Sequence, residues 1–359
     1  MTVPPPARRR LLTVPGLLLA TLVGILVTPP VALGALAADL VTRRWQLRWF
    51  RLWFLALGVA GVEALGTLAT GVLWVRHAPG GIRSPASVAA HHRLQMWWVR
   101  AVVAVMRRTI ALRYEVDGVD LLGRGHAVVL ARHASHLDAM LPAWLFGVLG
   151  DRRVRYVLKE DLQWSPALDT VAKRLPNVFV DRSPVAGSEQ LAHLHRLARD
   201  MDDDSVCVIF PEGTFYTPTR RDRAVARLAR TRPDLEALAR RFRHILPPRP
   251  AGTLALLDGA PDADVVIVGH VGLEGFASLA EISRSVPLRH PVHVRVWRHR
   301  RSELPTERDD IITWIVRRWL ELDDWIDAEL ARRRAATDPG DRPDGPSSDP
   351  IAPANPEAP

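Results

Sequence analysis

The stretch Ala127-Val-Val-Leu-Ala-Arg-His-Ala-Ser-His-Leu-Asp138 sets a short apolar run directly before a histidine and an aspartate. Its first five residues have the length and composition of a strand that is buried on both faces of a parallel sheet. From Leu137 through Leu145, apolar residues recur at helical spacing. His133 is therefore predicted at the carboxyl end of a strand, where open α/β sheets build their sites.

His133 and Asp138 are suited to acid–base chemistry once a turn brings them together. A carboxylate that holds one imidazole nitrogen fixes the tautomer and leaves the other nitrogen to accept a proton from a hydroxyl. The spacing alone is weak, because a chain with 13 histidines is expected to contain roughly one such pair by chance. His195 and Asp200 have the same spacing, but they lie in an amphipathic helical stretch and are interpreted as solvated face residues.

Apolar runs and helical segments alternate through residues 110–300, which predicts an α/β domain with a mixed, largely parallel sheet flanked by helices. A helical stretch over 221–244 is expected to break at Pro233, because proline lacks the N–H that a helix interior needs. A last amphipathic helix is expected over 309–333. The expected strands are 112–116, 127–131, 155–158, 178–180, 206–210, 265–269 and 292–297.

Two long apolar stretches open the chain, one over residues 11–41 and one over residues 52–75. At about 1.5 Å per helical residue, each exceeds the roughly 30 Å of membrane hydrocarbon. Residues 43–51 between them are rich in arginine and tryptophan, which is typical of an interfacial anchor. Residues 1–80 are therefore predicted to form a membrane helical hairpin, followed by a catalytic domain over 81–334.

Alternatives remain open for this hairpin. The first stretch also resembles a cleaved secretory signal, because Ala35-Leu-Ala37 mimics a cleavage site. Pro29-Pro30 suggests a helix that is broken into a re-entrant hairpin. Glu63, the one charge in the second stretch, indicates either a functional group or a helix-packing contact.

The net charge of +9 and the pI near 10.8 indicate an anionic partner. No zinc-finger or RNP-type signature accompanies the charge, so nucleic acid is not expected, and arginines beside tryptophans favour anionic lipid. The helical stretch 91–108 is expected either to lie in the membrane interface or to cover the core. The single cysteine, Cys207, excludes an intramolecular disulfide, and residues 335–359, rich in proline and aspartate, are predicted to be a disordered tail.

Three blocks carry a family resemblance: His133 to Asp138, Phe179 to Arg182, and Phe210-Pro-Glu-Gly213. In order and separation they resemble the blocks of the PlsC-like glycerolipid acyltransferases, the 1-acylglycerol-3-phosphate type, over about residues 90–300. The resemblance implies transfer of an acyl chain from a thioester, usually acyl-CoA, to the hydroxyl of a lysophospholipid, with no cofactor besides this co-substrate. The stretch 244–252 resembles the branch that includes lysocardiolipin acyltransferases.

The resemblance suggests a role for each site residue. His133 is expected to act as general base, and Asp138 to orient it and to stabilise its cation. Glu212, together with the backbone N–H groups of Gly213 and Thr214, is expected to shape the acceptor pocket.

Phosphate recognition is expected from the second block and from a separate lysine. Arg182 offers a planar fork for the acceptor phosphate, Phe179 belongs to the same block, and Lys159 matches a frequent family lysine. The chain departs from the family pattern at Pro176, which replaces a glycine. It also departs after the third block, where the usual basic cluster is expected at Arg220, Arg221 and Arg223.

Two other classes of function remain as alternatives. His133, His136 and Asp138, with His270 as a distant ligand, suggest a metal-dependent hydrolase, although zinc sites need more partners than this spacing supplies. A membrane lipid-binding protein without catalysis is the third possibility. If the donor is acyl-CoA, which is cytosolic, we expect the enzyme in the cell membrane with its catalytic domain on the cytoplasmic face. The sequence indicates no oligomeric state.

Overall fold

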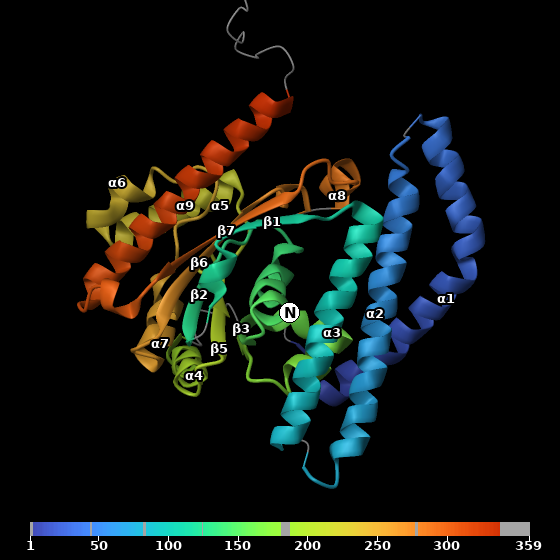
Figure 1. Cartoon of the computed structure of the whole chain (residues 1–359), viewed down its shortest axis with the longest axis horizontal. Helices are drawn as coiled ribbons and strands as arrows, with labels where there is room; N and C mark the ends of the chain where they lie inside the picture. The colour runs from blue at the N-terminus through green and yellow to red at the C-terminus, as the bar shows by residue number, and fades with distance from the viewer. Residues whose placement is uncertain are drawn as a thin grey trace, which may run out of the picture.

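A mixed sheet forms the centre of the molecule. In the computed structural model of the chain, the described residues are 3–43, 45–81, 84–123, 125–180, 187–276 and 279–337. Within them the sheet has seven strands in the order β1-β7-β6-β2-β5-β3-β4 (Figure 1). The strands from β6 to β4 run parallel, and β7 pairs antiparallel with β6 and parallel with β1. The predicted mixed, largely parallel α/β sheet is therefore confirmed.

All seven expected strands are present in the described part of the chain. The strand that leads to His133 has the expected bounds, and the strand that leads to Glu212 is shifted by one residue. The bounds are Tyr114–Asp117 (β1), Ala127–Ala131 (β2), Arg153–Lys159 (β3), Val178–Val180 (β4), Ser205–Ile209 (β5), Asp264–Val271 (β6) and Val292–His299 (β7).

Helices cover both faces of the sheet (Figure 1). Alternate side chains of β2 point to opposite faces: Val128 and Leu130 share a core with α4, α5, α7 and α9, whereas Ala127 and Val129 share one with α3 and η3. Because both faces are buried, the strand is apolar throughout. The helices in these two layers are Pro85–Ile110 (α3), Ala143–Leu149 (η3), Gly187–Arg199 (α4), Pro218–Thr231 (α5), Glu236–Ala239 (α6), Pro250–Gly259 (α7), Leu279–Ser285 (α8) and Arg308–Thr337 (α9).

The helix expected after β2 is irregular. It begins as a 3-10 turn, Asp138–Met140 (η2), and continues as the π-helix η3. The N–H groups of Ala134 and Ser135 donate to Asp138, which orders the loop before this turn, and Pro142, which lacks an N–H, directly precedes η3. The remaining short turns are Val119–Leu122 (η1), Glu160–Trp164 (η4), Leu168–Ala172 (η5), Pro233–Leu235 (η7), Glu274–Phe276 (η8) and Arg301–Glu303 (η9).

The expected break at Pro233 is confirmed, since α5 ends at Thr231 and η7 begins at the proline. At the end of the domain, α9 continues to Thr337. The predicted tail therefore starts too early at residue 335, and residues 338–359 lie outside the described residues.

The two N-terminal apolar stretches form the helices Pro6–Val41 (α1) and Arg48–His77 (α2), which pack against each other and, through α2, against α3 (Figure 1). By length and composition both are able to cross a membrane. Helix α1 bends but stays helical through Pro29 and Pro30, so a re-entrant break at this point is contradicted.

Packing bears on two open alternatives. Ser165 Oγ donates to Glu63 at 3.1 Å, which ties α2 to the catalytic domain and favours the packing role of Glu63. Helix α3 covers the core, because Val99, Val102 and Met106 are buried in it.

Candidate active site

The pair His133 and Asp138 is formed at the carboxyl end of β2. The two atoms His133 Nδ1 and Asp138 Oδ1 lie 2.8 Å apart. Because an ionised carboxylate can only accept, Nδ1 carries the proton and Nε2 presents a lone pair. The acid side chain is buried at 0 % exposure while the imidazole keeps 17 %, so a hydroxyl can reach the base but not the acid behind it.

Asp138 is held as a carboxylate by a dense set of donors. Its Oδ2 accepts the N–H of Ser135 at 2.7 Å and that of Ala134. Burial alone would raise the pKa of Asp138, but His133 and His270 beside the carboxylate outweigh it and lower the pKa to about 2. Asp138 is therefore charged at neutral pH and stabilises a positive charge on His133.

His270 is a neighbour of this acid that the sequence did not suggest in this role. Its Nε2 lies 3.3 Å from Asp138 Oδ2, and the side chain is buried in β6. The register explains the meeting, because Ala131 pairs with Val268 in the parallel β2–β6 pair, which puts His270 level with His133. A polar side chain inside a strand that is otherwise buried and apolar was the available signal.

Glu212, which follows β5, links its own segment to the backbone of His133 and to the backbone of Leu246. Its Oε1 accepts the N–H of His133 at 2.8 Å and its Oε2 accepts the N–H of Leu246 at 3.0 Å. Burial raises the pKa of Glu212 to about 8, against the opposing effect of these two backbone bonds. The buried carboxyl thus holds the backbone of His133 and of Leu246 in place.

The turn after Glu212 requires a glycine. Gly213 has φ +71°, a left-handed conformation that favours glycine, and its N–H donates to the carbonyl of Phe210 at 3.0 Å, within the turn. Thr214, which follows, is half-buried. The expected role of these two residues in shaping an acceptor pocket stays a prediction.

Two phenyl rings border the imidazole of His133. The ring centroid of His133 lies 4.7 Å from that of Phe210 and 4.4 Å from that of Phe215. His136 is exposed and stacks edge-on against Phe215 at 4.6 Å. Apolar walls around the base exclude water and strengthen its interaction with Asp138. The sequence analysis did not identify Phe215 as a site residue.

The residues expected to meet phosphate lie apart from this centre. Lys159 ends β3, two strands from β2, and pairs with Asp161. Phe179 lies in β4, three strands from β2, a sideways distance on the order of 14 Å, with Lys173 Nζ 5.8 Å from its ring. Arg182 lies outside the described residues, so its predicted contact stays a prediction.

Of the basic cluster expected after the third block, Arg221 is bonded away from the site. Arg221 Nε donates to the carbonyl of Phe242 at 2.6 Å, and its other nitrogen to that of Arg240. The cation that lies against Gly213 is Arg249 instead, 3.4 Å from the position of a Cβ on that glycine. This arginine belongs to a segment more than 30 residues downstream, which is why the local pattern missed it.

The metal cluster of the hydrolase alternative is not formed. Nδ1 of His133 is committed to Asp138, and His136 lies against Phe215. Across the described parts of the chain, no three His, Cys, Asp or Glu side chains are placed to hold a metal ion.

A family comparison identifies the domain built around this pair. The acyltransferase family model matches residues 113–248, a span that contains His133, Asp138 and Glu212. This part of the chain therefore matches the acyltransferase family model, as its three blocks predicted.

Two curated relatives are acyltransferases by name, and one solved structure is similar to the chain. An uncharacterized acyltransferase of Schizosaccharomyces pombe is 24% identical over 215 residues, which cover 56% of this chain and 59% of the relative. The 1-acyl-sn-glycerol-3-phosphate acyltransferase epsilon of Mus musculus is 26% identical over 206 residues, 54% of this chain and 55% of the relative. The chain thus spans less than two thirds of each. The crystal structure of the 1-acyl-sn-glycerophosphate (LPA) acyltransferase PlsC from Thermotoga maritima has a TM-score of 0.40 and 12% identity, over 76% of this chain and 98% of that one.

Proposed function

We propose that the protein is a membrane-bound acyltransferase that moves a fatty acyl chain from acyl-CoA, or a similar thioester, to the free hydroxyl of a lysophospholipid such as 1-acylglycerol-3-phosphate. The observation that carries the proposal is the 2.8 Å contact of His133 with the buried Asp138 inside an acyltransferase domain. The name of the murine relative supports the acceptor class.

The chemistry follows from the tautomer. Nε2 of His133 takes the proton of the acceptor hydroxyl while the oxygen attacks the thioester carbonyl. Asp138 stabilises the resulting imidazolium. As the tetrahedral intermediate collapses, the carbon–sulfur bond breaks and His133 returns the proton to the leaving thiolate, so an ester and a free thiol result. No acyl-enzyme is required.

Membrane association is supported by α1 and α2, whose large apolar side chains face outward. A lysophospholipid is drawn from a membrane, so an enzyme held at the bilayer meets its acceptor directly. A cytosolic acyl-CoA donor would place the catalytic domain on the cytoplasmic face.

The test is turnover by the full-length protein in nanodiscs, with 1-acylglycerol-3-phosphate and a long-chain acyl-CoA. Because His133 is the proposed general base, we expect His133→Ala to lower kcat by about 100- to 10,000-fold. His195→Ala is the matched control, since it has the same spacing to an aspartate but lies on α4, and we expect normal rates. Turnover of His133→Ala within twofold of the unmodified protein would remove this base from the mechanism.

A further inference from the structure

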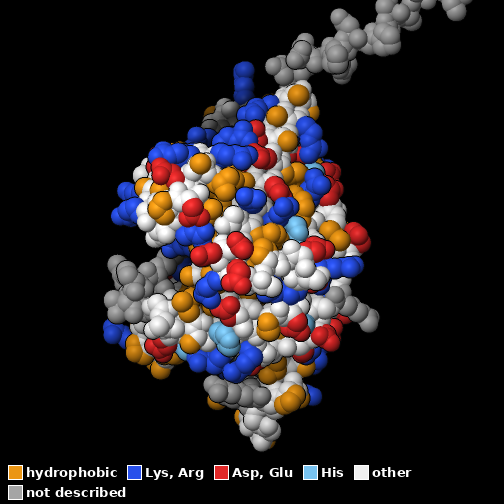
Figure 2. Space-filling model, turned by 90° about the vertical axis from the view of Figure 1, so that its left-hand side faces the viewer, with side chains coloured by type: hydrophobic (Ala, Val, Ile, Leu, Met, Phe, Trp, Pro, Cys, Tyr) orange, Lys and Arg blue, Asp and Glu red, His pale blue; other side chains and the backbone are white. Residues whose placement is uncertain are grey.

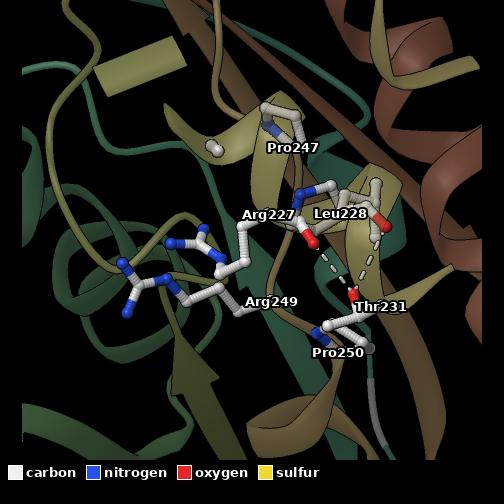
Figure 3. A pocket seen from close by; sticks show the side chains of 8 residues that line it. Arg227, Leu228, Thr231, Pro247, Arg249 and Pro250 are labelled. Carbon is white, nitrogen blue, oxygen red and sulfur yellow. Dashed lines mark hydrogen bonds between the residues drawn. The ribbon is translucent and has the colours of Figure 1, made fainter. Parts of the chain in front are cut away.

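A cavity of about 250 Å³ lies beside the Gly213 turn (Figure 3). Helix α5 forms one side, and the segment from Pro247 to Pro250 forms the other. In Figure 3 the side chains of Arg227 and Arg249 extend in the same direction, with their guanidinium groups on the same side of the cavity. Leu228 and the prolines give the cavity apolar walls.

Arg249 is fastened to the catalytic loop. Its backbone N–H donates to the carbonyl of Pro211 at 2.8 Å, and its guanidinium atoms would lie 3.4 Å from a Cβ on Gly213. Three residues earlier, Leu246 donates to Glu212, whose other oxygen holds His133. The cavity is therefore coupled through short contacts to the backbone of the proposed base.

The two guanidinium groups are not neutralised by the protein. Over the described ranges, no carboxylate lies within ion-pair distance of Arg227 or Arg249, and neither guanidinium has a hydrogen-bond acceptor. Desolvation lowers the pKa of Arg249, and the like charge of Arg227 lowers it further, so the two repel each other. Arg232, at the end of the same helix, is by contrast paired with Asp234 and Asp309.

We propose that Arg227 and Arg249 bind a phosphate group of a substrate whose reacting end lies at His133. Two planar guanidinium groups that line one cavity, neither paired with a carboxylate of the described residues, match a phosphate dianion, which can accept hydrogen bonds from both. The phosphate belongs either to the lysophospholipid acceptor or to the CoA part of the donor. This inference rests on the proposed acyl transfer and names the residues that recognise its charged substrate.

Kinetics with Arg227→Gln and Arg249→Gln separate the two sources. Charged hydrogen bonds lost from a bound ground state raise KM, here by about 10- to 100-fold, with a smaller change in kcat. If KM rises for 1-acylglycerol-3-phosphate but not for a monoacylglycerol, the pocket binds the phosphate of the acceptor. If KM rises for acyl-CoA but not for acyl-pantetheine, which lacks phosphate, the pocket binds a phosphate of the donor. Arg230→Gln, an exposed arginine on the same helix, is the control and should leave each KM unchanged.

A binding measurement keeps this inference separate from the proposed function. Titration of the full-length protein with inorganic pyrophosphate, followed by calorimetry, should show binding that the double variant loses while its Tm stays the same. Arg249→Lys should restore it only in part, because an ammonium lacks the fork. In another outcome, the unmodified protein binds pyrophosphate, the double variant loses that binding, and yet the unmodified protein transfers no acyl chain. That result would support the phosphate pocket and contradict the proposed acyl transfer. An active double variant with unchanged KM values and unchanged pyrophosphate binding would contradict the proposal that Arg227 and Arg249 bind phosphate.

Discussion

Asp138 fixes which nitrogen of His133 is free, and this gives a prediction for a single-atom change. In Asp138→Asn the amide NH₂ can donate to Nδ1, which moves the imidazole proton to Nε2 and removes the lone pair that accepts from the hydroxyl. We expect kcat to fall by about 10,000-fold, as it does in serine-protease triads when the same change gives the wrong histidine tautomer, while KM changes little. Steady-state kinetics check this, and a kcat within tenfold of normal would contradict the assigned tautomer.

The second imidazole on Asp138 gives an independent prediction. His270 lowers the pKa of Asp138 and so shares its charge with His133. In His270→Leu the carboxylate acts on His133 alone, which strengthens its stabilisation of the imidazolium. The acid limb of kcat/KM should therefore move to higher pH. A purely structural role for His270 would lower the rate at every pH without moving that limb.

At the scale of elements, Glu212 holds the ends of β2 and β5 to the segment that precedes α7. Glu212→Gln keeps the size of the side chain but turns an NH₂ toward the N–H of His133 or Leu246. We expect the free energy of unfolding to fall by about 1–3 kcal/mol, the cost of an unsatisfied buried group. The rate should fall with it, because the backbone of His133 loses its support. A thermal scan and a rate assay on the same sample check both.

The pH dependence of that stability has a definite sign. The folded pKa of Glu212, about 8, lies above its ordinary value of 4.5, so the folded state binds the proton more tightly. The stabilisation of the folded state by protonated Glu212 is therefore complete below pH 4.5 and is lost as pH rises through 8. The Tm difference between the unmodified protein and Glu212→Gln should therefore narrow from pH 5 to pH 9. A gap that stays constant over this range would show that Glu212 is already ionised in the folded state at pH 5.

How far the sequence predicts these elements depends on how local their causes are. Strand β2 and the break at Pro233 follow from neighbouring residues and were predicted within one or two positions. The contacts of Glu212 with Leu246, of Asp138 with His270 and of Gly213 with Arg249 join residues 34 to 132 positions apart, so they depend on strand order, which no local pattern contains.

At the scale of the whole molecule, the surface has two characters. The face around α9, α6 and α7 carries basic and acidic side chains intermixed, with scattered apolar ones (Figure 2). The α1–α2 hairpin instead exposes large apolar side chains along its length, among them Leu11, Leu26, Leu33, Leu65 and Val72. This asymmetry favours the hairpin side as the one that meets lipid.

A buried acid fixes the start of α1 to the catalytic domain. Asp169 accepts from Arg9 and from Arg10 Nε, the latter at 2.7 Å, and Lys173 Nζ lies 3.3 Å away. Burial would raise the pKa of Asp169, but the hydrogen bonds from Arg10 and Arg9 outweigh it and lower the pKa. Because Leu11, the first residue of the apolar run, follows directly, this contact sets how the hairpin meets the domain.

Asp169→Asn should release this contact, because three cations then share a site without a negative charge. Breaking a buried pair costs about 3 kcal/mol or more, so we expect the Tm to fall by several degrees and protease to cleave between residues 42 and 47 more readily. If the hairpin holds the active site at the bilayer, the rate should drop for acceptor presented in vesicles but not for a short-chain, water-soluble lysophospholipid. Asp309→Asn, which removes an exposed partner of Arg232, is the control. Equal losses for both acceptors would mean that Asp169 supports the catalytic domain itself rather than its orientation on the membrane.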